Sequence, residues 1–389
     1  MRRLALSLAA GASLLLTGCS DPGMLETARP APSTPVHHGT ATAAASVVPD
    51  PEPLRSGERF LDVSLPVAYE PGVEGSGTDD YRCFVLDPDL SRDSLVAGVD
   101  IKPGNPDLVH HVIVHKVDPD RVGDALALEA AEPDPGYSCF GGSGLENGPG
   151  DGLDRATWIG AWAPGGGERV LAEDLGIPLT MGSRLIVQMH YSLLTGSGTD
   201  RSKVRLRVAD DNGTKKSLET MLLPAPVELP CRERNQGGLC VRDRAVHDVI
   251  ERFGDAGRTG DMLHFLCGPA APGPTQSCTR EIREAGTIRA VAGHMHLLGK
   301  AIAIDVNSGA ADERRILDLP VWDFDDQGAV PLEEPASIEP GDTLTVTCTH
   351  DQRLRDLLPA LQDVPERYVV WGEGTTDEMC LGIVLLTRP

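Results

Sequence analysis

Residues 108–117 read LVHHVIVHKV, a short apolar run rich in β-branched residues that ends at the turn signal Asp118-Pro119. Valine and isoleucine at this density favour a β-strand, because branched side chains pack well on a pleated surface. Similar runs recur between turn signals, a pattern that predicts a β-domain over about residues 60–208. These runs are FLDVSLPV (60–67), YRCFVLD (81–87), SRLIVQMHYSLL (183–194) and KVRLRVA (203–209).

A second series of apolar runs begins near Leu218 and predicts a second β-domain that reaches the C-terminal end. One helix is expected between the two series, within residues 241–260, where apolar residues recur at helical spacing. These residues are Val246, Val249, Ile250 and Phe253. The runs of the second series are TIRAVAGHMHLLGKAIAIDV (287–306), TLTVTCTHD (343–351), YVVWGEG (368–374) and MCLGIVLL (379–386).

The composition favours an all-β protein. The chain has 43 Gly, 31 Pro and only 4% aromatic residues, which suits short strands joined by many turns better than long helices. At 389 residues it exceeds one ordinary sandwich domain, so we expect two consecutive domains of roughly 150 residues each. We place these domains at residues 58–212 and 213–389.

The formal net charge is −23 at pH 7, and no segment of the sequence forms a basic stripe. A surface of this sign repels phosphate groups. Nucleic acid and anionic lipid surfaces are therefore not expected as partners.

The N-terminus resembles a bacterial lipoprotein signal peptide. Two arginines precede an apolar run that extends from Leu4 to Leu16, and the next small residues lead to Cys19, the residue that would carry the lipid. The apolar run is shorter than the ~20 residues that a membrane-spanning helix needs. We therefore expect residues 1–18 to be a signal peptide and Cys19 to anchor the protein to a membrane of the cell envelope.

The residues after the lipidation site favour one membrane and a flexible start. Ser20 and Asp21 follow Cys19, which favours the outer membrane over retention at the inner membrane. Residues 19–57 are rich in Pro, Ala, Ser and Thr and are expected to form a disordered tether. The adjacent His37 and His38 lie in this tether, and we assign them no function.

Eight cysteines remain after Cys19, and we expect them to form disulfides. An even number of cysteines in an exported chain favours disulfides over a metal cluster. No two of them show the Cys-x-x-Cys spacing of a zinc knuckle or a thioredoxin-like site. They are Cys83, Cys139, Cys231, Cys240, Cys267, Cys278, Cys348 and Cys380, and their spacing alone leaves the pairing open.

Five of the eleven histidines lie inside or beside apolar strands, where a buried imidazole needs a partner. They are His110, His111, His190, His294 and His296. Residues two apart on a strand face the same way, so His294 and His296 would form a clamp for one metal ion.

The adjacent pair, His110 and His111, poses a different problem. Neighbouring strand residues face opposite ways, so both can reach one ion only through a β-bulge or through different ring nitrogens. His111 with His115 is the alternative clamp, because these two residues share a strand face. His190 is a single histidine on an apolar strand, and its function depends on what lies beside it.

Met379 lies beside Cys380 near the end of the chain. A buried methionine usually fills a core, but its thioether is also a soft donor that favours Cu(I).

Taken together, these motifs resemble the copper type II, ascorbate-dependent monooxygenases, a family that includes peptidylglycine α-hydroxylating monooxygenase and dopamine β-hydroxylase. The resemblance extends over about residues 60–389 and includes DDYRCFVLD (79–87), WAPG (162–165), VWDFD (321–325) and WGEGTTDEMC (371–380). The motifs follow in the family's order: His110-His111, Gln188-Met189-His190-Tyr191, His294-Met295-His296 and Met379-Cys380.

The resemblance implies two copper ions per chain. His110, His111 and His190 would hold an electron-transfer copper, which leaves His115 as a structural residue. His294, His296 and Met379 would hold the catalytic copper, which binds O₂. The implied reaction is hydroxylation of a C–H bond of a small organic substrate, with ascorbate or a similar reductant.

The resemblance also implies a fold and some of its disulfides. The family has two antiparallel β-sandwich domains of jelly-roll type, with a copper-lined cleft between them. Cys83 with Cys139 would close a loop near the histidine pair, and Cys348 with Cys380 would fix the strand that carries Met379. Cys231 with Cys240 and Cys267 with Cys278 are paired by proximity in sequence.

The chain departs from the peptide-amidating members of this family at two places. Ala292 stands where those enzymes carry an arginine for the peptide carboxylate, and Leu381, Gly382 and Ile383 replace polar and phenolic residues. We therefore expect an apolar or otherwise different substrate. The main alternative is a copper-binding or copper-delivery lipoprotein without turnover, and a structural β-sandwich with incidental histidines is the third.

Overall fold

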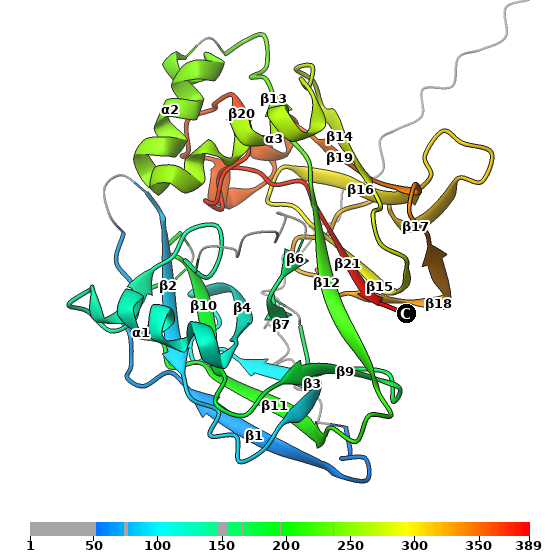
Figure 1. Cartoon of the computed structure of the whole chain (residues 1–389). Helices are drawn as coiled ribbons and strands as arrows, with labels where there is room; N and C mark the ends of the chain where they lie inside the picture. Colours follow the sequence, from blue (N-terminus) through cyan, green and yellow to red (C-terminus); the bar gives the residue numbers. More distant parts are fainter. Residues whose placement is uncertain (1–51, 74–76, 146–154, 165, 195, 236) are drawn as a thin grey trace, which may run out of the picture. The chain divides into compact units, whose positions relative to one another are not determined.

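The apolar runs of the sequence form strands throughout the part of the chain that the computed structural model describes, which is residues 52–73, 77–145, 155–164, 166–194, 196–235 and 237–389 (Figure 1). Strands account for 42% of these described residues and helices for 15%, and the sheets are mainly antiparallel. The prediction of an all-β sandwich fold is therefore confirmed.

The strands of the N-terminal part are β1 (Glu58–Ser64), β2 (Asp79–Leu86), β3 (Ser94–Lys102), β4 (Val109–Val117), β5 (Tyr137–Ser138), β6 (Arg155–Ala156), β7 (Trp158–Trp162), β8 (Arg169–Val170), β9 (Leu175–Leu179), β10 (Arg184–Ser192) and β11 (Lys203–Asp210). The neighbouring strands β1, β11, β3 and β9 form one layer, and the sheet β5-β2-β10-β4-β7 forms the other. A core of buried apolar residues from both layers, including Val96, Val112 and Leu206, holds them together.

The strands of the C-terminal part are β12 (Lys216–Pro224), β13 (Glu228–Leu229), β14 (Thr275–Glu281), β15 (Gly286–His294), β16 (Gly299–Val306), β17 (Arg314–Leu319), β18 (Val330–Ile338), β19 (Thr343–His350), β20 (Val369–Val370) and β21 (Leu381–Thr387). The neighbours β12, β21, β15 and β18 pack on the sheet β14-β19-β16-β17 through residues such as Val291, Ile304 and Val346. A short parallel pairing of β9 with β12 joins this part to the N-terminal layer.

Within the described residues, three α-helices lie outside the sheets: α1 (Val122–Ala130), α2 (Arg242–Phe253) and α3 (Thr259–Cys267). The helix predicted within residues 241–260 is α2, and its residues Val249 and Phe253 are buried against Tyr368 and Val370. Neither α1 nor α3 was predicted from the sequence. None of the helices in the described residues is long and apolar enough to cross a membrane.

The described residues all belong to one compact unit, and the boundary predicted between residues 212 and 213 stays a prediction. The signal peptide (1–18), Cys19, and His37 and His38 lie outside the described residues. Only the end of the tether predicted at 19–57 is described, and there the carbonyl oxygens of Glu52 and Pro53 accept hydrogen bonds from Arg207.

Candidate metal centre

Two neighbouring strands bring three of the predicted histidines together. His190 on β10 pairs with His111 on β4, and the next residue, Tyr191, pairs with Val109. His110 is therefore the extra residue of a β-bulge, in which two residues of one strand oppose one residue of its partner. Of the two arrangements left open for the adjacent histidine pair, the β-bulge is the one present.

The ring nitrogens of these residues, here called the three-histidine cluster, converge closely. The Nδ1 atom of His190 lies 2.9 Å from Nδ1 of His110 and 3.1 Å from Nδ1 of His111. One ligand atom from each of the three lies within 4.8 Å of the others. An ion held at ~2.0 Å from three imidazole nitrogens places them roughly 3.3 Å apart, so the cluster needs only small movements to fit one.

Asp79 on β2 fixes the orientation and tautomer of His190. The Nε2–H of His190 donates to Oδ1 of Asp79 over 2.9 Å, which turns the Nδ1 lone pair toward His110 and His111. The hydroxyl of Thr375 donates to the same oxygen. Burial alone would raise the pKa of Asp79, but the hydrogen bond and charge of His190 lower it below its usual value. Asp79 therefore stays ionised beside the cluster.

Two imidazoles of the cluster, those of His110 and His111, are kept neutral by their surroundings. Burial lowers the pKa of His110 and of His111 well below 6.5, and the neighbouring imidazoles lower it further. A neutral imidazole is the form that binds a metal ion. Nε2 of His110 is also buried without a hydrogen-bond partner among the described residues.

His115 lies on the same strand but outside the cluster. Its Nδ1 is 3.2 Å from the hydroxyl of Thr157, and its ring meets Trp158 edge-on at 6.2 Å between centres. His111 contacts His190 instead, so the alternative clamp of His111 with His115 is not the arrangement that the structure has.

His294 and His296 are brought together by a turn, which corrects the prediction that both lie on one strand. Strand β15 ends at His294, and His296 lies in the connection to β16. Their ring centres are 5.2 Å apart and their planes are nearly perpendicular, at 86°. Strand alternation therefore cannot explain the geometry of this pair.

Each of these two rings is oriented through Nδ1, which leaves Nε2 free. Nδ1 of His294 lies 2.6 Å from Oε1 of Gln327, and Nδ1 of His296 lies 3.3 Å from the carbonyl oxygen of Asp377. Nε2 of His296 is buried and has no hydrogen-bond partner among the described residues. Metal-binding histidines commonly show this pattern, in which the second nitrogen is held by an acceptor.

Glu378 holds the turn that carries His296. Its carboxylate accepts hydrogen bonds from the backbone N–H groups of His296, over 3.0 Å, and Leu298. Nε2 of His350, at the end of β19, lies 3.1 Å from the carbonyl oxygen of Met379 and 3.3 Å from Glu378. One buried carboxylate and one buried imidazole thus connect the His296 turn to Met379.

Met379 and one histidine of each set line one cavity. This cavity has a volume of about 520 Å³, and its lining includes His111, His294 and Met379. The ring of His111 lies 5.8 Å from that of His294, and the ring of His110 lies 6.4 Å from that of His296. The volume falls within the ~300–1,000 Å³ of typical small-molecule sites.

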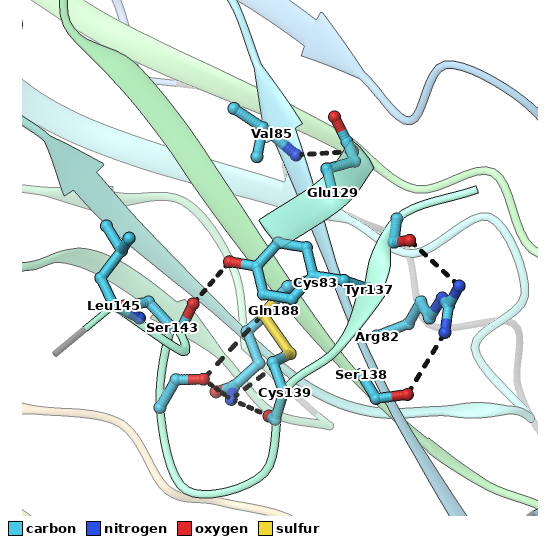
Figure 2. The surroundings of a disulfide bond; sticks show 12 residues. Arg82, Cys83, Val85, Glu129, Tyr137, Ser138, Cys139, Ser143, Leu145 and Gln188 are labelled. Carbon is cyan, nitrogen blue, oxygen red and sulfur yellow. Dashed lines mark hydrogen bonds between the residues drawn. A yellow bond between two sulfur atoms is a disulfide. The ribbon is translucent and has the colours of Figure 1, made fainter. Parts of the chain in front are cut away.

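The loop beside the cluster is cross-linked (Figure 2). Cys83 on β2 forms a disulfide with Cys139, and the amide nitrogen of Gln188 donates to the carbonyl oxygens of Cys139 and Gly142. Gly142 lines the cavity, so this network fixes part of its wall. All four predicted disulfides are present: Cys83–Cys139, Cys231–Cys240, Cys267–Cys278 and Cys348–Cys380.

Residues 274–386 match the family model of the copper type II ascorbate-dependent monooxygenase C-terminal domain. This part of the chain is similar to that domain. The resemblance predicted from the motifs is thereby confirmed, and members of the copper type II monooxygenase family depend on copper and ascorbate.

Solved structures of other classes share little with this chain. The major capsid protein P2 of Bacteriophage PM2 is 11% identical, with 85% of this chain and 97% of that chain covered and a TM-score of 0.28. Vicilin from Solanum lycopersicum (tomato) is 8% identical, with 85% and 74% covered and a TM-score of 0.17. Scores this low carry no argument about function.

The residues present fit the copper of the monooxygenase family. Imidazole and thioether groups are donors that copper accepts in its two oxidation states. Several of the imidazoles are neutral and have a buried nitrogen without a partner among the described residues. Asp79, Gln327 and His350, which orient these groups, were not identified from the sequence.

Proposed function

We propose that the protein is a copper-dependent monooxygenase that hydroxylates a C–H bond of a small organic substrate, with O₂ and with ascorbate or a similar reductant. The observation that carries this proposal is that His111 of the three-histidine cluster, His294 of the second pair and Met379 all line one cavity of small-molecule size. In the overall reaction, one oxygen atom enters the C–H bond, and the other leaves as water with the electrons of the reductant.

The chain offers two groups of copper ligands with different chemistry. His110, His111 and His190 would hold a copper for electron transfer, because three imidazoles suit both oxidation states. A second group of His294, His296 and Met379 would hold the copper that reacts with O₂, because a thioether favours Cu(I). Copper supplies the redox chemistry when bound, while the protein orients its ligands and the substrate.

The cavity supports an apolar substrate. Ala292, Leu381 and Ile383, which replace polar groups of the peptide-amidating members of the family, all line it. We expect these side chains to exclude water from the bound C–H bond. Amidation of peptides is therefore not part of this proposal.

Burial of the ligands favours an enzyme over a carrier. A copper-delivery protein must hand its ion to a partner and needs accessible ligands. His190 and His296 are both 0% exposed, and the cavity lined by His111 and His294 offers space for a substrate rather than for a partner's ligands. We also propose that the protein works at the cell envelope, anchored through Cys19.

The first test counts copper and measures turnover in residues 20–389, the chain without its predicted leader and lipidation site. We expect two copper ions per chain and O₂ consumption that depends on ascorbate. Met379→Ala should retain the fold and lower this consumption by about 100-fold or more, because even groups behind the ligands contribute 10–100-fold. Copper analysis and an oxygen electrode measure the two quantities.

Met221→Ala is the matched control, because Met221 is partly buried on β12 and packs against the core rather than lining the cavity. It should leave O₂ consumption unchanged. Binding of fewer than two copper ions, or copper binding without any oxygen chemistry, would favour the carrier.

A second prediction concerns Asp79. Asp79→Asn replaces the anion that polarises His190 with a neutral acceptor, so copper affinity at the three-histidine cluster should fall about 10–100-fold. Competition with a chelator of known affinity measures the change. The control is Asp80→Asn, because Asp80 accepts from the hydroxyl of Tyr69 and, unlike Asp79, forms no hydrogen bond with His190. Equal losses in the two variants would contradict the assigned role of Asp79.

A further inference from the structure

The cavity has a floor made of three neighbouring strands. On β12, β21 and β15 every second residue faces the cavity, so the side chains form rows across the sheet. The row with His294 contains Leu381 and Pro224, and the next row contains Ala292, Ile383 and Leu222. The next two rows contain Leu385 with Thr220, and then Leu218.

This floor is long and apolar. Rows on one face repeat every two residues, which is about 6.8 Å along a strand, so the row with Leu218 lies roughly 20 Å from the row with His294. Trp158 packs with Leu222, Ile383 and Met379 near the histidine end. An extended hydrocarbon chain fits such a floor better than a compact polar molecule does.

Few charged side chains line the cavity apart from the histidines, and most of them are engaged or neutral. Glu168 is bound to Arg207 through two hydrogen bonds. Burial raises the pKa of Glu373 to about 7, which leaves much of it uncharged at neutral pH. Asp326 is an exposed residue at the rim. Arg169 is the remaining charged residue of the lining within the described chain.

Arg169 has no hydrogen bond or ion pair within the described residues, although its side chain is partly buried. It lies on β8, opposite Val99 of β3. Burial lowers the pKa of its guanidinium, but arginine remains protonated in proteins. An unpaired cation in an apolar cavity is costly, because burial without a partner loses hydration. No structural partner among the described residues therefore accounts for the position of Arg169.

The chain near Arg169 packs at the end of the floor that is distant from His294. Leu171, two residues along the chain, contacts Leu218 and Leu385 in one apolar cluster. Leu385 lies two rows, and Leu218 three rows, beyond the row that contains His294. The cavity thus has a cation toward one end and the proposed copper ligands at the other.

We propose that Arg169 binds the anionic head group of an otherwise apolar substrate, whose chain lies on the floor with a C–H bond near His294 and Met379. This inference rests on the proposed monooxygenase function. A carboxylate suits the site, because the planar guanidinium donates two parallel hydrogen bonds to it. The substrate class is accordingly a carboxylate with an extended hydrocarbon chain.

Binding to residues 20–389 without copper tests this inference directly. Three of the four tryptophans, Trp158, Trp162 and Trp371, line the cavity, so intrinsic fluorescence reports its occupation. The probes are decanoate, decanol and decyltrimethylammonium, each below its micellar concentration. Decanoate should bind about 10–100-fold more tightly than decanol, as expected for hydrogen bonds to a charged group.

Arg169→Gln should remove the preference for decanoate while it leaves decanol binding unchanged, and Arg169→Lys should retain part of it. Arg184→Gln is the control, because Arg184 is paired with Asp87 away from the cavity lining. Equal binding of decanoate and decanol to the wild type would overturn the inference, as would failure of both to bind. Copper binding and O₂ consumption are measured in separate experiments. If the protein showed no copper-dependent oxygen chemistry but still bound decanoate through Arg169, only the proposed function would be contradicted.

Discussion

Replacing Glu378 with alanine should lower the free energy of unfolding by about 4 kcal/mol and detach His296 from its place. The Glu378 side chain is fully buried and accepts from the backbone N–H groups of His296 and Leu298. A buried donor that loses its acceptor costs about 1–3 kcal/mol, and the imidazole of His350 also loses a neighbour. Urea unfolding of the copper-free chain measures the loss.

Two variants separate this role from a general effect of removing a carboxylate. Glu378→Gln keeps one oxygen acceptor and should show an intermediate loss. Glu219→Ala removes a partly exposed carboxylate paired with Arg388, for which less than about 1 kcal/mol is expected. If Glu378→Ala were as stable as Glu219→Ala, the turn would be held by other contacts. In a copper titration of Glu378→Ala, the site that includes His296 should also lose its affinity for copper, while the site that includes His190 retains it.

The strands were predictable because their pattern is local. Branched apolar runs such as residues 203–209 define a strand and its buried face without reference to the rest of the chain. The run at 287–306 was misleading, because apolar residues continue through the turn at Leu297 and Leu298. Gly299 was the missed signal: a Cβ there would lie 2.7 Å from Trp322 and 2.9 Å from Met295.

The histidines of the candidate site were predictable, but the groups that orient them were not. Imidazoles are rare and their spacing carries information, so all five could be selected from the sequence. Asp79 is one of 58 acidic residues, and its contact with His190 joins segments 111 residues apart. Gln327 and His350 likewise make their contacts with His294 and Met379 across 33 and 29 residues of sequence. Such contacts depend on tertiary structure, which no local pattern encodes.

Lowering the pH should destabilise the copper-free chain strongly through its buried histidines. Burial lowers the pKa of His115 and of His294 to about 3, whereas in the unfolded chain both titrate near 6.5. Between these values the unfolded chain binds more protons, so stability is greatest above pH ~6.5 and falls as the pH drops toward ~3. At pH 5 each of these two residues should cost about 2 kcal/mol. Burial also lowers the pKa values of His110, His111 and His296, so these residues add to the same trend.

His115→Phe isolates one of these residues without touching a proposed copper ligand. Each such histidine contributes ~1.4 kcal/mol per pH unit, so the slope of unfolding free energy against pH between pH 4 and 6 should decrease by that amount. The slope is informative because a change in packing shifts the stability equally at every pH. Glu373, with a pKa raised to about 7, opposes the trend in both proteins and cancels in the comparison. His247→Phe is the control, because His247 is exposed on α2, and it should leave the slope unchanged. If His115→Phe also left the slope unchanged, His115 would take up its proton in the folded chain.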